Sequence, residues 1–237
     1  MLTPTVTAPD PYQRLTHLGA DGQLSRGDTL ADQAYARLHQ ALITGLLAPE
    51  QVLTVRGVAA SFGVSLTPVR EAIQRLVAAR ALTIENGRTI RVPRLDLETY
   101  REILKIRIEL EYLAAKAAAA RIPNEEIDAL EKIVETHRAA IEAGDAHATL
   151  AANTEFHLRM YRASGCTILY GIIESLWLRV GPTLNLLFPQ YCGSLVGHEY
   201  HMAAIEALRR RDGETLGKAM QDDLTTGAKY LLRLLKP

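Results

Sequence analysis

The sequence has few cysteines and no long apolar run. Its two cysteines, Cys166 and Cys192, are far apart in a chain of 237 residues. This spacing favours reduced packing residues over a disulfide or a metal pair. No apolar stretch approaches the roughly 20 residues of a membrane span, and the first residues lack the charged-then-apolar pattern of a secretion signal. These absences predict a cytoplasmic protein with no membrane partner.

The sequence also has no net charge, since 27 basic residues balance 27 acidic residues. This balance argues against a generic binder of polyanions. The charge is unevenly distributed, however. Residues 30–95 hold eight arginines and four acidic residues, a net charge of +4, whereas the first 29 residues carry −1 and the remainder carries −3. A basic N-terminal region of this kind is the electrostatic footprint expected of a nucleic-acid-binding module.

A helix-turn-helix pattern follows Gly63. This glycine can supply the tight turn, Ser65 or Thr67 can cap the next helix, and Pro68 is tolerated in its first turn. Apolar residues then recur on one helical face and polar residues on another. The apolar face holds Val69, Ile73, Leu76 and Val77, and the polar face holds Thr67, Arg70 and Gln74. Such a helix can anchor in a small core while its N-terminal side chains face base edges in DNA.

The flanking sequence predicts the rest of a winged module. An amphipathic helix is expected over 30–44, and Thr54 can cap a second helix over 55–62. Two short alternating runs, 82–84 and 89–92, are joined through Asn86-Gly87, which is the strongest short signal for a β-hairpin. This hairpin would form a wing, and its arginines, Arg88 and Arg91, could touch the sugar-phosphate backbone or the minor groove.

Together these residues resemble the N-terminal domain of GntR-family transcription regulators. The resemblance covers residues 30–93 and is most specific from Gly63 to Leu76. It implies four DNA-contacting residues, Arg56, Ser65, Thr67 and Arg70.

Leu66 departs from the family pattern, in which this position is usually an arginine that reads a guanine. An arginine–guanine contact contributes roughly 1–3 kcal/mol of discrimination. We therefore expect Leu66 to give an altered operator or weaker binding rather than no binding. The wing departs too, with Asn86-Gly87-Arg88 where Asn-Arg-Gly is more usual.

From Asp96 onwards the apolar spacing is helical almost throughout. Six helices are expected over about 96–121, 124–143, 145–164, 167–188, 194–211 and 212–235. The breaks between them are expected at Pro123, Gly144, Gly165 and Pro189. The predicted fold is therefore mainly α, a winged helix-turn-helix with a small β-hairpin followed by an antiparallel bundle of about six helices.

Three regions follow from this pattern. Residues 1–28 read as a flexible arm, residues 29–93 as the DNA-binding domain and residues 94–237 as a helical domain for effector binding and dimerisation. The helical domain resembles the FCD-type ligand-binding domain of the FadR subfamily in its length, helix count and position after the wing.

Four polar residues match the ligand positions of metal-binding FCD domains, with two changes. They are Asn153 in place of Asp, His157, His201, and Asp223 in place of His. Such nitrogen and oxygen ligands suit Zn, Ni, Mn or Fe, and open coordination positions would take the carboxylate of a small effector. The alternative is a metal-free polar pocket in which the two histidines bind an anion directly. His198 competes with His201 for the third position, and His137 is expected to face solvent.

Three further residues are candidates for effector binding. By resemblance to the first bundle helix of FCD domains, Arg107 is expected to pair with an effector carboxylate. A salt bridge to Glu111 or Glu174 is an equal alternative. Tyr161 lies one turn after the histidine of the motif, and Arg179 follows Trp177.

These features predict a homodimeric transcription regulator and not an enzyme. Two winged modules would bind the half-sites of a near-palindromic double-stranded operator, and a small organic acid would control that binding. The interpretation favours a repressor over an activator. Two alternatives are a metal-free regulator that responds to an acyl-coenzyme A or an organic acid, and a metal-dependent hydrolase.

Overall fold

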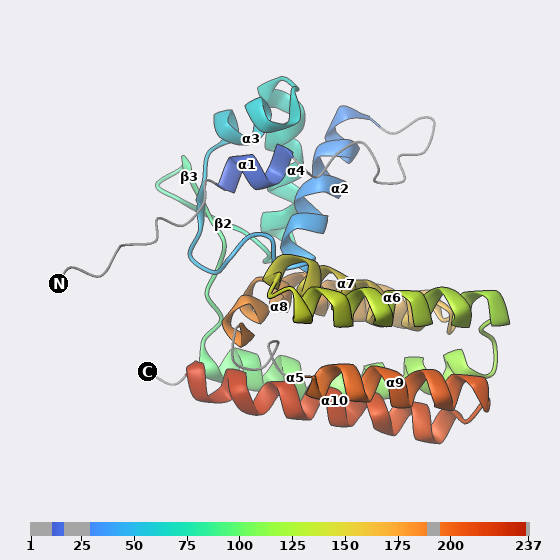
Figure 1. Ribbon diagram of the computed structural model, residues 1–237. Coiled ribbons are helices and arrows are strands. Elements are labelled where there is room, and N and C mark those ends of the chain that lie inside the picture. Colours follow the sequence, from blue (N-terminus) through green and yellow to red (C-terminus); the bar gives the residue numbers. More distant parts are fainter. Residues whose placement is uncertain (1–10, 17–28, 189–194, 236–237) are drawn as a thin grey trace. The chain divides into compact units, whose positions relative to one another are not determined.

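The computed structural model describes residues 11–16, 29–188 and 195–235. Contacts divide the chain into two compact units, one of residues 1–42 and 46–93 and one of residues 43–45 and 94–237. Figure 1 shows the elements of both units. Within the described ranges, no helix has the length and apolar character needed to cross a membrane.

The first unit is a winged helix-turn-helix. Its elements are α1 (Pro11–Thr16), α2 (Leu30–Ile43), β1 (Val52–Leu53), α3 (Val55–Phe62), α4 (Leu66–Ala78), β2 (Thr83–Glu85) and β3 (Thr89–Arg91). The strands form an antiparallel sheet in the order β1-β3-β2, in which Ile84 lies opposite Ile90 and Val52 lies opposite Arg91. The predicted helices and hairpin are confirmed, whereas β1 was not foreseen because two residues are too few to show an alternating pattern.

Two turns shape the DNA-binding module. Gly63 ends α3 in the left-handed region, with φ of 66°, and so lets the chain turn directly into α4. In the hairpin, Asn86 and Gly87 both have positive φ, 50° and 69°. Asn and Gly are the residues that most readily adopt such left-handed conformations in hairpin turns.

The N-terminal arm was predicted to be flexible, and part of it is helical. The helix α1 packs against α3, and its Leu15 is fully buried. The rest of the arm, residues 1–10 and 17–28, lies outside the described residues.

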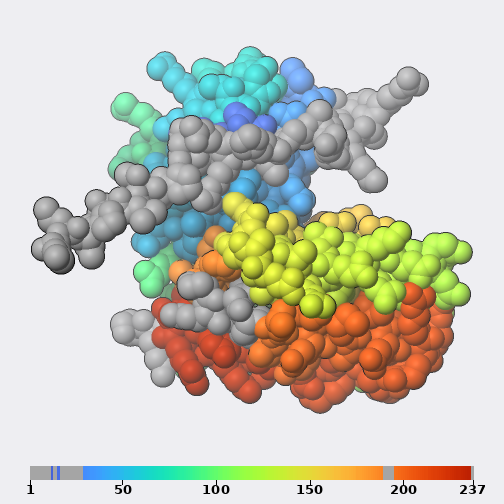
Figure 2. Space-filling view, viewed as in Figure 1, coloured from blue at the N-terminus to red at the C-terminus, as the bar shows by residue number. Residues whose placement is uncertain are grey.

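The second unit is a helical bundle. Its elements are α5 (Leu97–Ala119), α6 (Asn124–Glu142), α7 (Ala146–Arg162), α8 (Thr167–Val180), the 3₁₀ helix η1 (Gly181–Leu187), α9 (Val196–Arg209) and α10 (Gly213–Leu234). Figure 1 shows α5, α9 and α10 in one layer, with α6 and α7 in the other. Figure 2 shows α6, in yellow-green, lying along α9, in orange. The predicted bundle of about six helices is confirmed.

One predicted helix is too long. The α-helix expected over 167–188 ends at Val180 and continues as η1, with Pro182 near the start of the new helix. Proline lacks the N–H that an α-helix interior needs, so the helix changes type here. The break expected at Pro189 lies outside the described residues.

Candidate functional site

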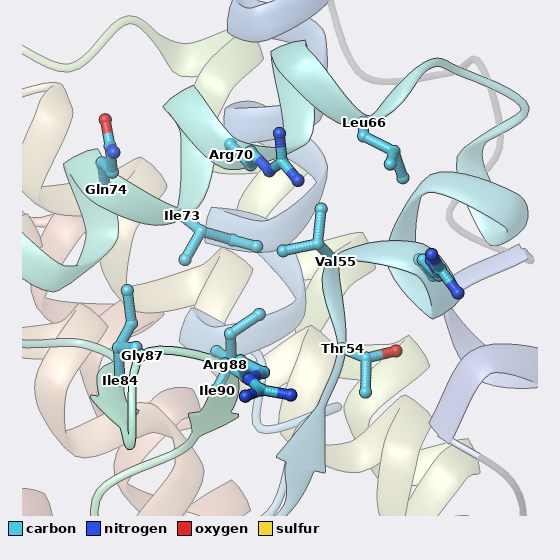
Figure 3. Close-up of a pocket in the computed structure, with 11 residues that line it drawn as sticks. Thr54, Val55, Leu66, Arg70, Ile73, Gln74, Ile84, Gly87, Arg88 and Ile90 are labelled. Carbon is cyan, nitrogen blue, oxygen red and sulfur yellow. The ribbon is translucent and has the colours of Figure 1, made fainter.

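A groove in the first unit brings the predicted DNA-contacting residues together. It measures about 640 Å³, and its walls come from the start of α3, from α4 and from the hairpin. The residues that line it include Thr54, Arg56, Leu66, Arg70, Gln74 and Arg88. Figure 3 shows Arg70 on α4 and Arg88 on the hairpin at opposite sides of the groove. Residues far apart in the sequence therefore form one continuous surface.

The helix α4 has the division of faces expected of a recognition helix. Its apolar face is buried, and it comprises Pro68, Val69, Ala72, Ile73 and Leu76. Thr67, Arg70 and Gln74 are exposed, and Leu66 is half-buried. Ser65 occupies the N-cap position, but its side chain makes no capping hydrogen bond. The Ser65 hydroxyl therefore remains available to an external acceptor such as a phosphate.

The arginines of this unit fall into two classes. Arg75 pairs with Asp32 at 2.8 Å, and Arg91 pairs with Glu85 through two hydrogen bonds of 2.8 and 3.0 Å. In contrast, Arg70 and Arg88 form no ion pair with any residue that the structure describes, and both are exposed. Of the two wing arginines, Arg88 is therefore the one that is exposed without an ion pair among the described residues.

In the second unit, three predicted metal ligands converge in the interior. His157 comes from α7, His201 from α9 and Asp223 from α10, and all three are buried. Nε2 of His157 lies 3.1 Å from Oδ2 of Asp223 and 3.2 Å from Nε2 of His201. Nε2 of His201 lies 3.9 Å from the same Asp223 oxygen. Three different helices thus each direct one donor atom towards a common point.

The donor set suits a divalent metal ion. In a tetrahedral zinc site with metal–ligand distances near 2.0–2.1 Å, neighbouring donors lie roughly 3.3 Å apart. The spacings of 3.1, 3.2 and 3.9 Å among His157, His201 and Asp223 are of this size. Burial, with lesser contributions from neighbouring histidines, lowers the pKa of His201 well below its usual value, so its imidazole stays neutral. A neutral imidazole is the form that binds metals.

Tyr161 contacts the first of these histidines. Its hydroxyl lies 3.0 Å from Nδ1 of His157, and its side chain is fully buried. Burial, followed by the charge of Glu111, raises the pKa of Tyr161 well above its usual value, so the phenol stays protonated. A proton on Nδ1 of His157, donated to the Tyr161 oxygen, leaves Nε2 free to act as a ligand.

Two further histidines, His137 and His198, can be compared with what the sequence predicted for them. His137, expected to face solvent, is only 4% exposed, and its ring centroid lies 4.9 Å from that of His201. It continues the buried stripe of α6 that includes Leu130, Val134 and Ile141, and this spacing is the signal that sequence reasoning missed. His198 is half-buried and lines a smaller groove of about 340 Å³ beside Met202. Of the two competitors, His201 is therefore the member of the buried cluster.

Arg107 is buried together with a carboxylate. Its Nε lies 2.5 Å from Oε1 of Glu111, and the two side chains are 4% and 0% exposed. The indole of Trp177 donates to the same oxygen at 3.0 Å, and the guanidinium stacks 4.4 Å from the centroid of its ring. Burial opposes the charged form, but the contact with Glu111 leaves the pKa of Arg107 raised. Arg107 therefore forms the salt bridge to Glu111 that the sequence offered as the alternative to effector binding.

Two predicted residues, Asn153 and Arg179, are half-buried. Arg179 is half-buried, and its Nε is screened from solvent without a hydrogen-bond partner among the described residues. Asn153 is half-buried on α7, one turn before His157. The roles of Asn153 and Arg179 remain predictions.

Comparison with known proteins agrees with both units. Residues 30–92 match the gntR family of bacterial regulatory proteins, and residues 102–226 match the FCD domain. The transcriptional regulator McbR of Escherichia coli K12 is 33% identical over 194 residues, which are 79% of this chain and 87% of McbR. The transcriptional repressor RspR of the same organism is 26% identical over 202 residues, 85% of this chain and 89% of RspR.

A solved structure of E. coli McbR/YncC superimposes with a TM-score of 0.83 at 29% identity, covering 88% of this chain and 100% of that one. These relatives are transcription regulators and not enzymes. The chain therefore belongs to the GntR family of bacterial regulatory proteins, with a C-terminal FCD domain, and is a DNA-binding transcription regulator.

Proposed function

We propose that this regulator binds a small organic acid at a divalent metal held by His157, His201 and Asp223, and that this binding controls its affinity for an operator. The observation that carries the proposal is the convergence of three donor atoms from three helices in a buried site. A metal ion bound there would offer open coordination positions to a carboxylate.

The surrounding residues support an anionic effector. Arg107 already pairs with Glu111, so the metal rather than this arginine is the expected anchor for the effector carboxylate. Arg179 holds a screened Nε without a partner among the described residues, which a second polar group of the effector would satisfy. Asn153, on the same face of α7 as His157, is the proposed neutral oxygen donor.

On DNA, the protein is proposed to act as a homodimer. Two winged modules would bind two half-sites, because a two-fold symmetric protein matches a near-palindromic operator. An effector that binds one arrangement of the domains more tightly than the other changes DNA affinity by that difference, commonly about 1–3 kcal/mol. RspR, a relative, is named a repressor, which favours repression here as well.

The metal is tested on protein purified without a histidine tag. We expect a stoichiometric divalent metal, or a rise in melting temperature when Zn²⁺ or Ni²⁺ is added to protein treated with a chelator. Asp223→Asn should abolish both effects. Asp222→Asn is the matched control, because Asp222 is the adjacent carboxylate and pairs with Lys218 at the surface of α10. A wild-type protein without metal and without a thermal shift would refute the metal site.

The regulatory role is tested by sequencing the genomic DNA fragments that the purified protein retains at physiological salt. Enrichment of a few near-palindromic sites is expected, and the adjacent genes will indicate which small acids to add. The acid that releases DNA from the wild type should fail to release it from Asp223→Asn. Equal release from both proteins would show that the acid binds without the metal, as in the metal-free alternative.

A further inference from the structure

We propose that the N-terminal helix α1 is a working part of the DNA-binding module, in which Tyr12 holds the start of α3 so that Arg56 faces DNA. The inference concerns the first unit alone and does not depend on the metal or on an effector. It assigns a role to a segment whose sequence, rich in Thr, Pro, Asp and Gly, indicates only a mobile arm.

The first support is a pair of hydrogen bonds from Tyr12 to Thr54. The Tyr12 hydroxyl accepts from the backbone N–H of Thr54 at 2.9 Å and lies 3.3 Å from the Thr54 hydroxyl. Thr54 is the N-cap of α3, and its hydroxyl accepts from the N–H of Gly57 at 3.0 Å. Tyr12 therefore contacts the residue that determines where α3 begins.

The second support is the absence of a side chain at Gly57. A Cβ atom at this position would lie 2.2 Å from Cζ and 2.3 Å from Cε1 of Tyr12, much closer than any real contact. Glycine weakens a helix relative to alanine, yet one occurs here in the first turn of α3. The close approach of the Tyr12 ring accounts for it. On the same helix α1, Leu15 is fully buried and anchors the segment.

The third support is the position of the clamped residues. Thr54, Val55 and Arg56 form one wall of the groove that also contains Arg70 and Arg88. Arg56 lies next to Gly57 in the first turn of α3 and is exposed. Because Tyr12 fixes that turn, the backbone at Arg56 is already ordered before DNA binds. Less conformational entropy is then lost when Arg56 contacts a phosphate.

A double-mutant cycle between Tyr12 and Gly57 tests the clamp. The variants are Tyr12→Ala, Gly57→Ala and the double variant, and the probe is the duplex most enriched among the retained genomic fragments. Each single variant should weaken binding about fivefold, because each one disrupts the same contact between Tyr12 and the start of α3. The double variant should be no weaker than Tyr12→Ala, because the added methyl group no longer has a ring to displace. Tyr12→Phe, which keeps the ring and loses the hydroxyl, should fall between wild type and Tyr12→Ala.

Two further readouts separate positioning from general stability. Without DNA, trypsin should cleave after Arg14 about tenfold faster in Gly57→Ala than in wild type, because local opening exposes the segment. Gly171→Ala, a helical glycine with open space around it, should leave this rate unchanged. With DNA, Tyr12→Ala should lower the slope of log affinity against log salt by about one, the loss of one phosphate contact, and Arg56→Ala should lower it no further in that background.

Two results would overturn the proposal. One is an unchanged cleavage rate after Arg14 in Gly57→Ala. The other is a double variant whose loss of affinity equals the product of the two single losses, since that would make Tyr12 and Gly57 independent.

Discussion

The hydroxyl of Tyr161 lies 3.0 Å from Nδ1 of His157, and Nε2 of the same ring lies 3.1 Å from Asp223. One buried imidazole is thus held from both sides, by a phenol at one nitrogen and by the proposed metal cluster at the other. Groups that hold a ligand's second nitrogen set its tautomer and orientation.

Tyr161→Phe should therefore lower the affinity of the regulator for Zn²⁺ by about 10- to 100-fold without unfolding it. The measurement is a competition titration against a chromophoric chelator. Tyr170→Phe is the control, because the Tyr170 hydroxyl bonds to Arg162 and Glu174 instead. Equal zinc affinities in wild type and Tyr161→Phe would show that the hydroxyl does not orient His157.

The buried pair of Arg107 and Glu111 yields a prediction about stability. Glu111→Gln leaves the Arg107 charge buried without its counter-charge, so the free energy of unfolding should fall by about 3–5 kcal/mol. Arg107→Met combined with Glu111→Gln should recover much of this loss, because it removes the buried charge. Urea denaturation measures both changes.

The control for this pair is Glu142→Gln. Glu142 pairs with Arg138 on the surface of α6, where both side chains are more than half exposed, so the change should cost at most about 1 kcal/mol. A similarly small fall in the free energy of unfolding for Glu111→Gln would mean that water reaches the pair of Arg107 and Glu111.

The wing offers two arginines with opposite expectations. Arg88→Ala should weaken binding to every DNA sequence and lower the salt slope by about one, because one phosphate contact is lost. Arg91→Ala should leave the slope unchanged, since Arg91 is already paired with Glu85. Fluorescence anisotropy at several salt concentrations measures the slopes. Equal slopes for the two variants would contradict the assignment of Arg88 to DNA.

Leu66→Arg should change the base preference of the regulator. An arginine at the first position of α4 can pair with the O6 and N7 atoms of a guanine, which contributes roughly 1–3 kcal/mol of discrimination. Selection from a randomised operator library should therefore enrich a guanine at one position of each half-site. An unchanged preference would place residue 66 away from the bases.

Much of the fold could be predicted because its signals are local. The helix α3 follows its expected cap, Thr54, and occupies the expected residues, 55–62. The hairpin turn follows from the left-handed tolerance of Asn86-Gly87. The strand β1 and the 3₁₀ character of η1 were missed. A two-residue strand exists only because β3 lies beside it, and the helix expected to run on to residue 188 changes type at Pro182.

The candidate sites were predictable to different degrees. His157, His201 and Asp223 were identified by their resemblance to a ligand pattern, and the structure brings their donor atoms together. The sequence offered two carboxylates for Arg107. The structure pairs it with Glu111, one turn later on α5, and Trp177 contacts both side chains. His137 was wrongly placed at the surface, although its spacing on α6 follows the buried stripe.

The sequence by itself determined the kind of protein, because capping residues, turn residues and apolar periodicity act over a few neighbouring positions. The winged module and the helical domain follow from such patterns. Only the tertiary structure decided which distant groups meet: Tyr12 with Gly57, Glu111 with Trp177, and three donor atoms from three helices. These contacts depend on how whole helices pack and on which polar groups lose water together, and no local spacing specifies either.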